Sequence, residues 1–326
     1  MLLKIAAILL GIFVIIGVIS FFGINDVLSI LARIDINIVI FAVLAQITII
    51  LLTAVRLSFI SRKYGHVPFR QVFKGSTVGI FAGLLSPLSR IGGEPFKIIA
   101  LKDRLGGSKS SAVIIIDTVA EIISSLAIVL LVLVLFANEI PKTIMSSFVI
   151  FLAVTTILFL IIARVFFNRA ILKRIFLWAI KKFPRFNHLK KKDCTEMFLD
   201  SFRLLVKDKK IMAGTLAISL VMKFLEFIRL WLVFLALGLA LPFNIVVIVW
   251  AVILVLLLIP WLPGSLGLVE FGGASAFIMF GVEKTSAVSG IIMDRLISFW
   301  LVLFISIVVI WFSEFKVRNI LKDINI

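Results

Sequence analysis

The sequence reads LLSPLSRIGGEPF at residues 84–96 and IPWLPGSLGLVEFGG at residues 259–273, two apolar stretches that proline and glycine interrupt. Each lies inside a longer apolar region, at residues 75–101 and 245–280. Because proline lacks a backbone N–H donor and glycine weakens helices, neither region should form one continuous helix. We therefore predict a broken, re-entrant helical hairpin in each, with its irregular backbone covered by protein or facing a polar cavity.

The remaining apolar segments are long enough to cross a bilayer as helices. Of the 326 residues, 62% are hydrophobic and only 16% are charged, which excludes a water-soluble globular protein. No runs of alternating polarity indicate a membrane barrel, so helices are the expected spanning element. The predicted fold is an all-α polytopic membrane protein with two hairpins and six full spans, at residues 5–22, 38–60, 112–136, 144–167, 211–239 and 287–312.

The positive charge is concentrated in loops. The net charge is +17, and residues 164–210 alone carry 14 Lys or Arg against 4 Asp or Glu. Basic loops of this kind remain on the cytoplasmic side and contact anionic lipids, whereas no basic face interleaved with aromatics indicates nucleic-acid binding. We predict a multi-pass protein of the cell membrane with both termini cytoplasmic, and an interfacial helix at residues 194–206, where apolar residues recur at helical spacing.

Landmarks recur in the same order in two halves, residues 1–140 and 141–326. Each half would contain two spans, a hairpin and a further span, and the second half would cross the membrane in the opposite sense. We therefore predict an inverted repeat. The paired landmarks are Arg56 and Arg229, each followed nine residues later by Gly65 or Gly238; Pro87 and Pro263, each seven residues before Glu94 or Glu270; and Asp117 and Asp294 near the start of a long apolar segment.

Several charged residues fall within or beside the apolar segments. A charge at the bilayer centre costs roughly 2.5 to 3.5 kcal/mol on insertion scales, so such residues need partners or a wet cavity. Arginine suits a phosphate because its planar fork binds two oxygens, and broken helices expose free amide donors. Alternatively the charges form structural ion pairs, and the glutamates cap the freed amides. The candidate substrate-binding residues are Arg56, Arg90, Glu94, Lys97, Asp117, Arg229, Glu270, Asp294 and Arg295.

The sequence offers little for catalysis. It has one cysteine, Cys194, and two histidines, His66 and His188, which lie well apart in basic loops. No Ser-His or Cys-His arrangement, metal-protease motif or phosphate-binding P-loop appears in it. We expect neither an enzyme nor a bound metal or cofactor.

The motifs resemble the lysylphosphatidylglycerol synthase transmembrane-region family, also described as flippase-like or UPF0104 membrane proteins. The resemblance is carried by GGEPFK at residues 92–97, PGSLGLVE at residues 263–270, Gly281-Val282, and Asp294-Arg295-Leu296. It implies lipid translocation between leaflets. The aminoacyltransferase domain of the multidomain members is not expected here, so the synthase activity is not implied. Family members often carry arginine after the first acidic residue, where this chain has Thr118 after Asp117.

The leading hypothesis is an integral membrane lipid translocator for a lipid with an anionic head group. The resemblance makes a phospholipid or a polyprenyl-phosphate-type lipid the expected cargo. Inverted halves would allow a cavity between the hairpins to open to either leaflet in turn. The alternative is a membrane accessory of lipid-linked glycosylation or of a lipid-modifying transferase, for which acidic residues near the hairpins would bind a divalent cation.

Overall fold

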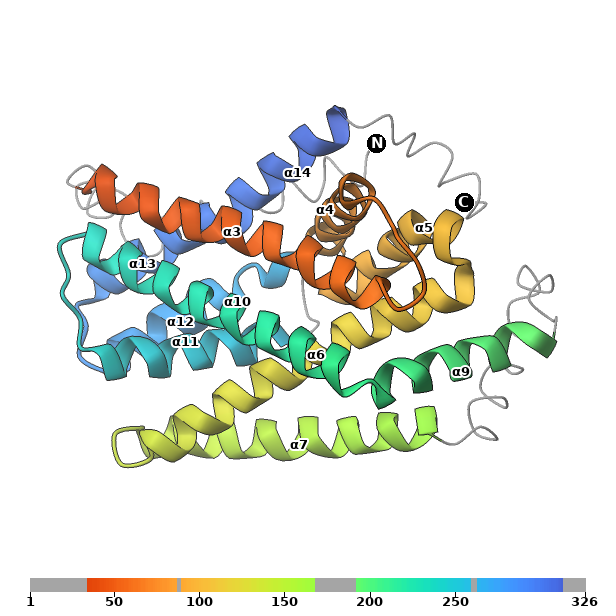
Figure 1. Ribbon diagram of the computed structural model, residues 1–326. Helices are drawn as coiled ribbons and strands as arrows, with labels where there is room; N and C mark the ends of the chain where they lie inside the picture. The colour runs from red at the N-terminus through yellow and green to blue at the C-terminus, as the bar shows by residue number, and fades with distance from the viewer. Residues whose placement is uncertain (1–33, 87–88, 168–191, 259–262, 313–326) are drawn as a thin grey trace.

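The computed structural model describes residues 34–86, 89–167, 192–258 and 263–312, which form helices and turns without any strand (Figure 1). Three helical stretches are long and apolar enough to cross a membrane, Ile36–Ser61, Gly107–Leu135 and Lys284–Trp311. The prediction of an all-helical membrane protein is confirmed. The predicted span at residues 5–22 and both termini lie outside the described residues, so the count of six spans and the orientation stay predictions.

Two long helices pack against each other in antiparallel fashion, α3 (Ile36–Ser61) and α10 (Lys209–Ala236). The direction follows from their contacts, because the N–H of Asp35 before α3 donates to the carbonyl of Ala236 at the end of α10 over 2.8 Å. At the other end, Gly214 lies against the ring of Phe59. Asp35 and Asp208 cap the two helices through their carboxylates, as short acidic residues at N-caps commonly do.

The first interrupted region is a helical hairpin, as predicted. It consists of α4 (Phe69–Leu85), the short 3₁₀ helix η1 (Ser89–Gly93) and α5 (Glu94–Leu105), and α4 packs along α5. Close approach depends on glycine, since a Cβ added at Gly75 would lie 2.3 Å from the Cβ of Ala100, and one at Gly93 would lie 2.0 Å from the carbonyl oxygen of Gly79. Small residues let the two backbones touch, which holds the hairpin closed.

The second interrupted region also folds back on itself. Its helices are α11 (Phe243–Leu258) and α12 (Leu268–Met279), and the described part of the turn between them contains η3 (Pro263–Ser265). Gly264 and Gly267 have φ of +59° and +81°, a left-handed conformation that disfavours side chains. The described turn residues of the two hairpins contact each other, as do α4 and η3. The interrupted backbone of both halves is therefore gathered at one place inside the protein.

The other helices surround this centre. They are α6 (Gly107–Leu135), α7 (Lys142–Phe167), α9 (Lys192–Lys207), α13 (Lys284–Arg295) and α14 (Val302–Trp311). Between α13 and α14 the chain forms a π-helical segment, η4 (Leu296–Leu301), so that these three elements make one continuous apolar stretch. Such π segments inside α-helices are frequently found at functional sites.

The predicted interfacial helix at residues 194–206 is present as α9, but its apolar face does not lie free. Leu199, Phe202 and Leu205 are buried, and α9 packs against α6. Met197 and Leu204 remain exposed on its other side. The protein, rather than lipid alone, therefore covers the apolar face of this helix.

Apolar and ionised side chains are distributed as in a membrane protein. Large apolar residues such as Leu131, Phe304 and Trp311 point outward and are more than half exposed, at 51%, 63% and 82%. Ionised residues in the long helices, by contrast, are buried toward the centre of the bundle. This arrangement suits a hydrocarbon solvent, in which charged groups must find partners inside the protein.

Candidate functional site

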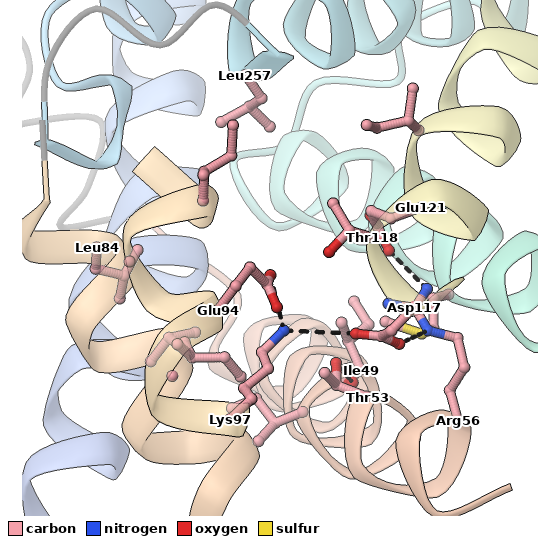
Figure 2. Close-up of a pocket in the computed structure, with 18 of the residues that line it drawn as sticks. Ile49, Thr53, Arg56, Leu84, Glu94, Lys97, Asp117, Thr118, Glu121 and Leu257 are labelled. Atoms are coloured by element: carbon pink, nitrogen blue, oxygen red, sulfur yellow. Dashed lines mark hydrogen bonds and ion pairs between the residues drawn. The ribbon is translucent and has the colours of Figure 1, made fainter. Parts of the chain in front are cut away.

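A cavity of about 250 Å³ opens where the first hairpin, α3 and α6 meet, with α11, η4 and α14 of the second half completing its wall (Figure 2). Most of the lining is apolar. Its ionised residues lie together on one side and are Arg56, Glu94, Lys97, Asp117 and Glu121. Four of these, all except Glu121, are among the residues predicted from sequence.

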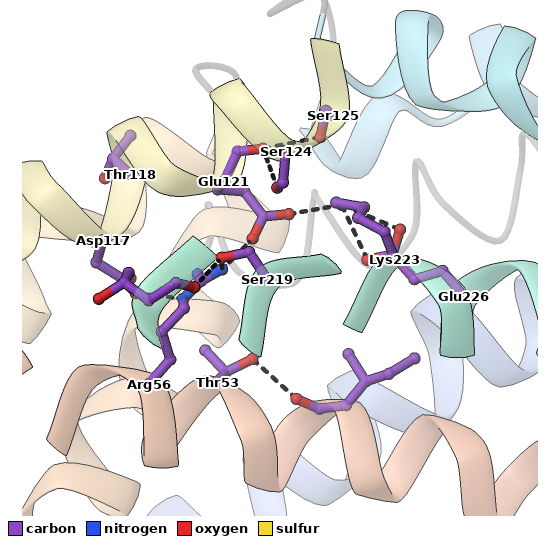
Figure 3. Close-up of polar contacts among 12 residues, drawn as sticks. Thr53, Arg56, Asp117, Thr118, Glu121, Ser124, Ser125, Ser219, Lys223 and Glu226 are labelled. Carbon is purple, nitrogen blue, oxygen red and sulfur yellow. Dashed lines mark hydrogen bonds and ion pairs between the residues drawn. The ribbon is translucent and has the colours of Figure 1, made fainter. Parts of the chain in front are cut away.

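Arg56 of α3 is the centre of the ionised side. Its Nε lies 2.7 Å from Oδ1 of Asp117, and its Nη1 lies 2.7 Å from Oε2 of Glu121 (Figure 3). Nη1 also donates to the hydroxyl of Ser219 on α10 over 2.8 Å. Asp117 and Glu121 are four residues apart on α6, so both carboxylates project from one face of that helix toward the same guanidinium.

Each carboxylate that binds Arg56 also has a second cation. Lys97 Nζ lies 3.4 Å from Oδ2 of Asp117 and 3.1 Å from Oε1 of Glu94. Lys223 Nζ lies 2.6 Å from Oε1 of Glu121 and also binds the carboxylate of Glu226 (Figure 3). The result is a continuous chain of ion pairs from α5 through α6 and α3 to α10. All of its members are largely buried, so the interactions are weakly screened by solvent.

The glycines of the first hairpin position Lys97. A Cβ at Gly79 would lie 2.6 Å from Cγ of Lys97, so the stem of the lysine lies directly on the bare backbone of α4. Its ammonium group is thereby held between Glu94 at the start of α5 and Asp117 on α6 (Figure 2). The irregular sequence at the break thus fixes a cation at the cavity wall.

The second half contains a simpler pair behind the cavity. Nε and Nη2 of Arg229 lie 2.8 Å and 3.3 Å from the two oxygens of Asp294, a two-pronged contact. Nη1 of Arg229 donates to Oε1 of Gln46 on α3 over 2.6 Å. The hydroxyl of Ser298 donates to the same aspartate over 3.4 Å. Gln46 and Ser298 line the cavity, whereas Arg229 and Asp294 do not.

Arg295 stabilises the turn of the second hairpin. Its Nε lies 2.8 Å from Oε1 of Glu270, and its Nη2 donates to the carbonyl of Gly264 over 2.7 Å. Its guanidinium also lies over the ring of Phe299, 5.1 Å from the centroid. These contacts join α12, η3 and the end of α13, so Arg295 and Glu270 serve the hairpin rather than the cavity wall.

The predicted residues therefore separate into two groups. Arg56, Glu94, Lys97 and Asp117 meet at the cavity, while Arg229, Asp294, Glu270 and Arg295 form pairs outside its lining. Arg90 lies in η1, at the turn of the first hairpin. The predicted substrate-binding set did not include three residues of this site, Gln46, Glu121 and Lys223. The four-residue spacing from Asp117 to Glu121 was a usable signal for the second of these.

Comparison with known proteins places the chain in a family. The family model described as "Lysylphosphatidylglycerol synthase TM region" matches residues 4–306. The chain belongs to this family. The match includes both interrupted hairpins and every predicted site residue, and it agrees with the resemblance seen in the sequence motifs.

Archaeal relatives of similar length match this chain along most of its sequence. A UPF0104 membrane protein of Pyrococcus horikoshii is 28% identical over 314 residues, covering 91% of this chain and 93% of the relative. One of Methanothermobacter thermautotrophicus is 25% identical over 330 residues, covering 97% of each chain. One of Methanocaldococcus jannaschii is 22% identical over 298 residues, covering 87% of each chain. Family membership and the helices together identify an integral membrane protein.

Proposed function

We propose that this protein is a lipid translocator, which moves a lipid with an anionic head group between the leaflets of the cell membrane. The observation that carries the proposal is the position of Arg56, which lines the cavity between two carboxylates that each have a second cation. A phosphate oxygen entering the cavity can therefore replace Asp117 or Glu121 at Arg56 without leaving that carboxylate unpaired.

Ordinary buried ion pairs do not allow such an exchange. Removing one partner of a buried pair costs about 3 to 5 kcal/mol, because the remaining charge has no compensation. Here Lys97 stays beside Asp117, and Lys223 stays beside Glu121, when the guanidinium turns away. Arginine binds phosphate through two parallel hydrogen bonds, which offset those that it gives up. Because each lysine also binds a glutamate, the network holds three cations and four carboxylates, and an anion would bind by displacing a carboxylate from Arg56.

The size of the cavity suits a head group. Its volume of about 250 Å³ is slightly below the roughly 300–1,000 Å³ of typical small-molecule sites. Acyl or polyprenyl chains would not fit inside and would remain in the surrounding hydrocarbon. The cavity lining is mostly apolar and includes Leu84, Ile91 and Leu257, which would contact the first part of those chains.

The contacts between α3 and α10 support an inverted repeat. Arg56 binds Ser219, which lies ten residues before Arg229, and Arg229 binds Gln46, which lies ten residues before Arg56. Each arginine also binds an aspartate that follows it by 61 or 65 residues. Reciprocal contacts of this kind are expected about a two-fold axis in the membrane plane, and related halves would give the cavity access to each leaflet in turn.

The proposal includes the orientation and the lipid contacts expected from sequence. Six spans with both termini in the cytoplasm would place the basic segment at residues 164–210 against the cytoplasmic leaflet, where it would contact anionic lipids. The described part of this segment supports such a position, because α9 keeps Arg203 and Lys207 on the same helix as the exposed Met197 and Leu204.

Transfer in liposomes tests the function directly. The full chain is reconstituted with a fluorescent, tail-labelled anionic phospholipid, and a membrane-impermeant quencher reports the rate at which label moves between leaflets. We expect protein to accelerate transfer and Arg56→Gln to reduce it about tenfold or more, the loss expected when a charge-assisted contact worth about 1.5 to 3 kcal/mol is removed.

The matched control is Arg62→Gln, which removes an exposed arginine just after α3 and should leave the rate unchanged. Protein-containing liposomes that transfer lipid no faster than empty ones would refute the function. Equal loss of transfer in both variants would assign the effect to the loss of one positive charge rather than to the position of Arg56.

A further inference from the structure

Gln46 presents an amide group that the ion-pair network does not use. The residue is 5% exposed, lies on α3 and lines the cavity. Its Oε1 accepts a hydrogen bond from Nη1 of Arg229 over 2.6 Å. Guanidinium groups only donate, so the oxygen of the amide must face Arg229 and the NH₂ group must face away from it. In the part of the chain that the structure describes, no hydrogen-bond acceptor is recorded for that NH₂ group.

The amide is fixed by the pair behind it. Arg229 is itself held by two contacts with Asp294, so the guanidinium that donates to Gln46 cannot easily rotate. At the wall of a largely apolar cavity this NH₂ group has few acceptors within reach, so it can donate to a group that enters the cavity. A ligand atom with a lone pair would accept that hydrogen bond.

Ser298 adds a second neutral group on the same side. It lies in η4, lines the cavity and donates to Oδ2 of Asp294, the oxygen that also accepts from Arg229. The 3.4 Å contact is long, and the hydroxyl oxygen keeps its lone pairs for another donor. Gln46 is thus hydrogen-bonded to Arg229 and Ser298 to Asp294, so this one ion pair positions both residues.

We propose that Gln46 and Ser298 form a neutral subsite that recognises a hydroxyl group in the polar part of the transported lipid, further along the same cavity from Arg56, since Gln46 lies ten residues before Arg56 on α3. The inference rests on the proposed function and names the class of its substrate, a phosphodiester whose head group carries a hydroxyl, such as a glycerol, an inositol or a sugar. Arg229 and Asp294 are positioning residues in this scheme, since they act through Gln46 and Ser298.

The chemistry favours a hydroxyl over a second anion. A hydroxyl oxygen accepts from the Gln46 amide and its proton donates to Ser298, so both partners are satisfied at once. An additional anionic group at this position would lie near Asp294, whose charge is already matched by Arg229. Sites built to hydrogen-bond a hydroxyl discriminate strongly against analogues that lack one, because the buried groups of the site are then left unpaired.

The test compares two lipids of equal charge. The full chain is reconstituted in liposomes with tail-labelled phosphatidylglycerol or tail-labelled phosphatidylmethanol, phosphodiesters that differ in the hydroxyls of the head group. The wild-type protein should transfer phosphatidylglycerol roughly three to ten times faster, and labelled phosphatidylinositol should behave like phosphatidylglycerol. Gln46→Glu keeps an acceptor for Arg229 but removes the NH₂ donor, so it should bring the ratio of the two rates close to one.

Two further variants separate recognition from folding. Ser298→Ala should lower the same ratio, which keeps the test available where Gln46→Glu fails to fold in detergent. Thr53→Val is the matched control, because the Thr53 hydroxyl lines the cavity but donates to the carbonyl of Ile49 on its own helix. It should leave the ratio unchanged.

The outcomes distinguish this inference from the function on which it rests. Equal wild-type rates for phosphatidylglycerol and phosphatidylmethanol, both above those of empty liposomes, would overturn the subsite and leave translocation intact. A wild-type preference that survives in both Gln46→Glu and Ser298→Ala would likewise overturn the assignment. Transfer of no probe would refute the proposed function and the subsite with it.

Discussion

Arg56 and Arg229 occupy comparable places on two antiparallel helices but have different partners. Arg56 divides its donors between Asp117 and Glu121, and each of these carboxylates also binds a lysine. Arg229 instead directs two donors at Asp294, for which no second cation is recorded among the described residues. We therefore expect the arginine–aspartate pair at Arg56 to be exchangeable and the pair at Arg229 to be fixed.

The most severe disturbance should follow from removing the fixed arginine. Arg229→Ala leaves Asp294, which is 3% exposed, without its cation and should lower the free energy of unfolding by about 3 to 5 kcal/mol. Thermal unfolding in detergent measures the loss. Arg56→Ala serves as the comparison and should be less destabilising, because both of its carboxylates keep a lysine. Equal destabilisation by the two changes would remove the distinction between the pairs.

A smaller effect is expected where the first hairpin positions Lys97. Gly79→Ala would bring a methyl group within 2.6 Å of Cγ of Lys97, and overpacking of this kind costs about 1 to 3 kcal/mol. Lipid transfer should also fall, since the second cation of Asp117 would be displaced. Gly107→Ala is the matched control, because nothing lies within 4 Å of a Cβ there. Unfolding and transfer measured side by side would contradict the expectation if the two alanine variants behaved alike.

The proposed exchange of a carboxylate for a phosphate oxygen at Arg56 can be weakened without substituting the arginine itself. The double variant Lys223→Met, Glu226→Gln removes a lysine and a glutamate together, so the net charge is unchanged, but Glu121 loses its second cation. Arg56 should then be held more firmly, and lipid transfer should fall roughly threefold to tenfold, the change expected from about 1 kcal/mol. Adding Glu121→Gln should restore part of the rate. A triple variant no faster than the double would argue against exchange.

The exposed pair Lys63–Asp208 should matter least. Nζ of Lys63 lies 2.6 Å from Oδ2 of Asp208, and this hydrogen bond holds the pKa of Asp208 below its ordinary value. A carboxylate with a lowered folded-state pKa contributes stability above its unfolded value of about 3.9, and loses that contribution as the pH falls through the folded-state pKa. In Asp208→Asn, the drop in unfolding midpoint between pH 7 and pH values below about 4 should be slightly smaller. An unchanged pH profile would show that the pair contributes nothing measurable.

The interrupted hairpins could be predicted because their cause is local. Proline and glycine at residues 84–96 and 259–273 prevent a continuous helix in any surroundings, and the structure confirms both interruptions. Pairing among the buried charges was also foreseen as the alternative to substrate binding. The structure joins Arg56 to Asp117 and Arg229 to Asp294, so each arginine pairs within its own half.

The roles of individual site residues could not be predicted in the same way. Gln46 faces Arg229 only because α3 and α10 pack in one antiparallel register, and no local pattern in either helix specifies that register. Thr118 shows the converse. It stands where the resemblance leads one to expect arginine, and its hydroxyl donates to the carbonyl of Ile114, while Glu94 pairs with Lys97 on its own helix. Which residue pairs with a given buried charge can therefore be read only from the three-dimensional structure.

The π-helical segment η4 carries a consequence for the phase of the helix that follows it. A π turn contains about one residue more than an α turn, so the same residues in an uninterrupted α-helix would be oriented differently after Leu301. Every side chain of α14 would then rotate by about 100° relative to α13. In the structure α14 packs against α4 of the first hairpin, while Phe299 of η4 lies against Gly264 of the second. The extra residue of the π turn therefore sets the rotation of α14 relative to α13, so that this continuous helical stretch contacts both hairpins.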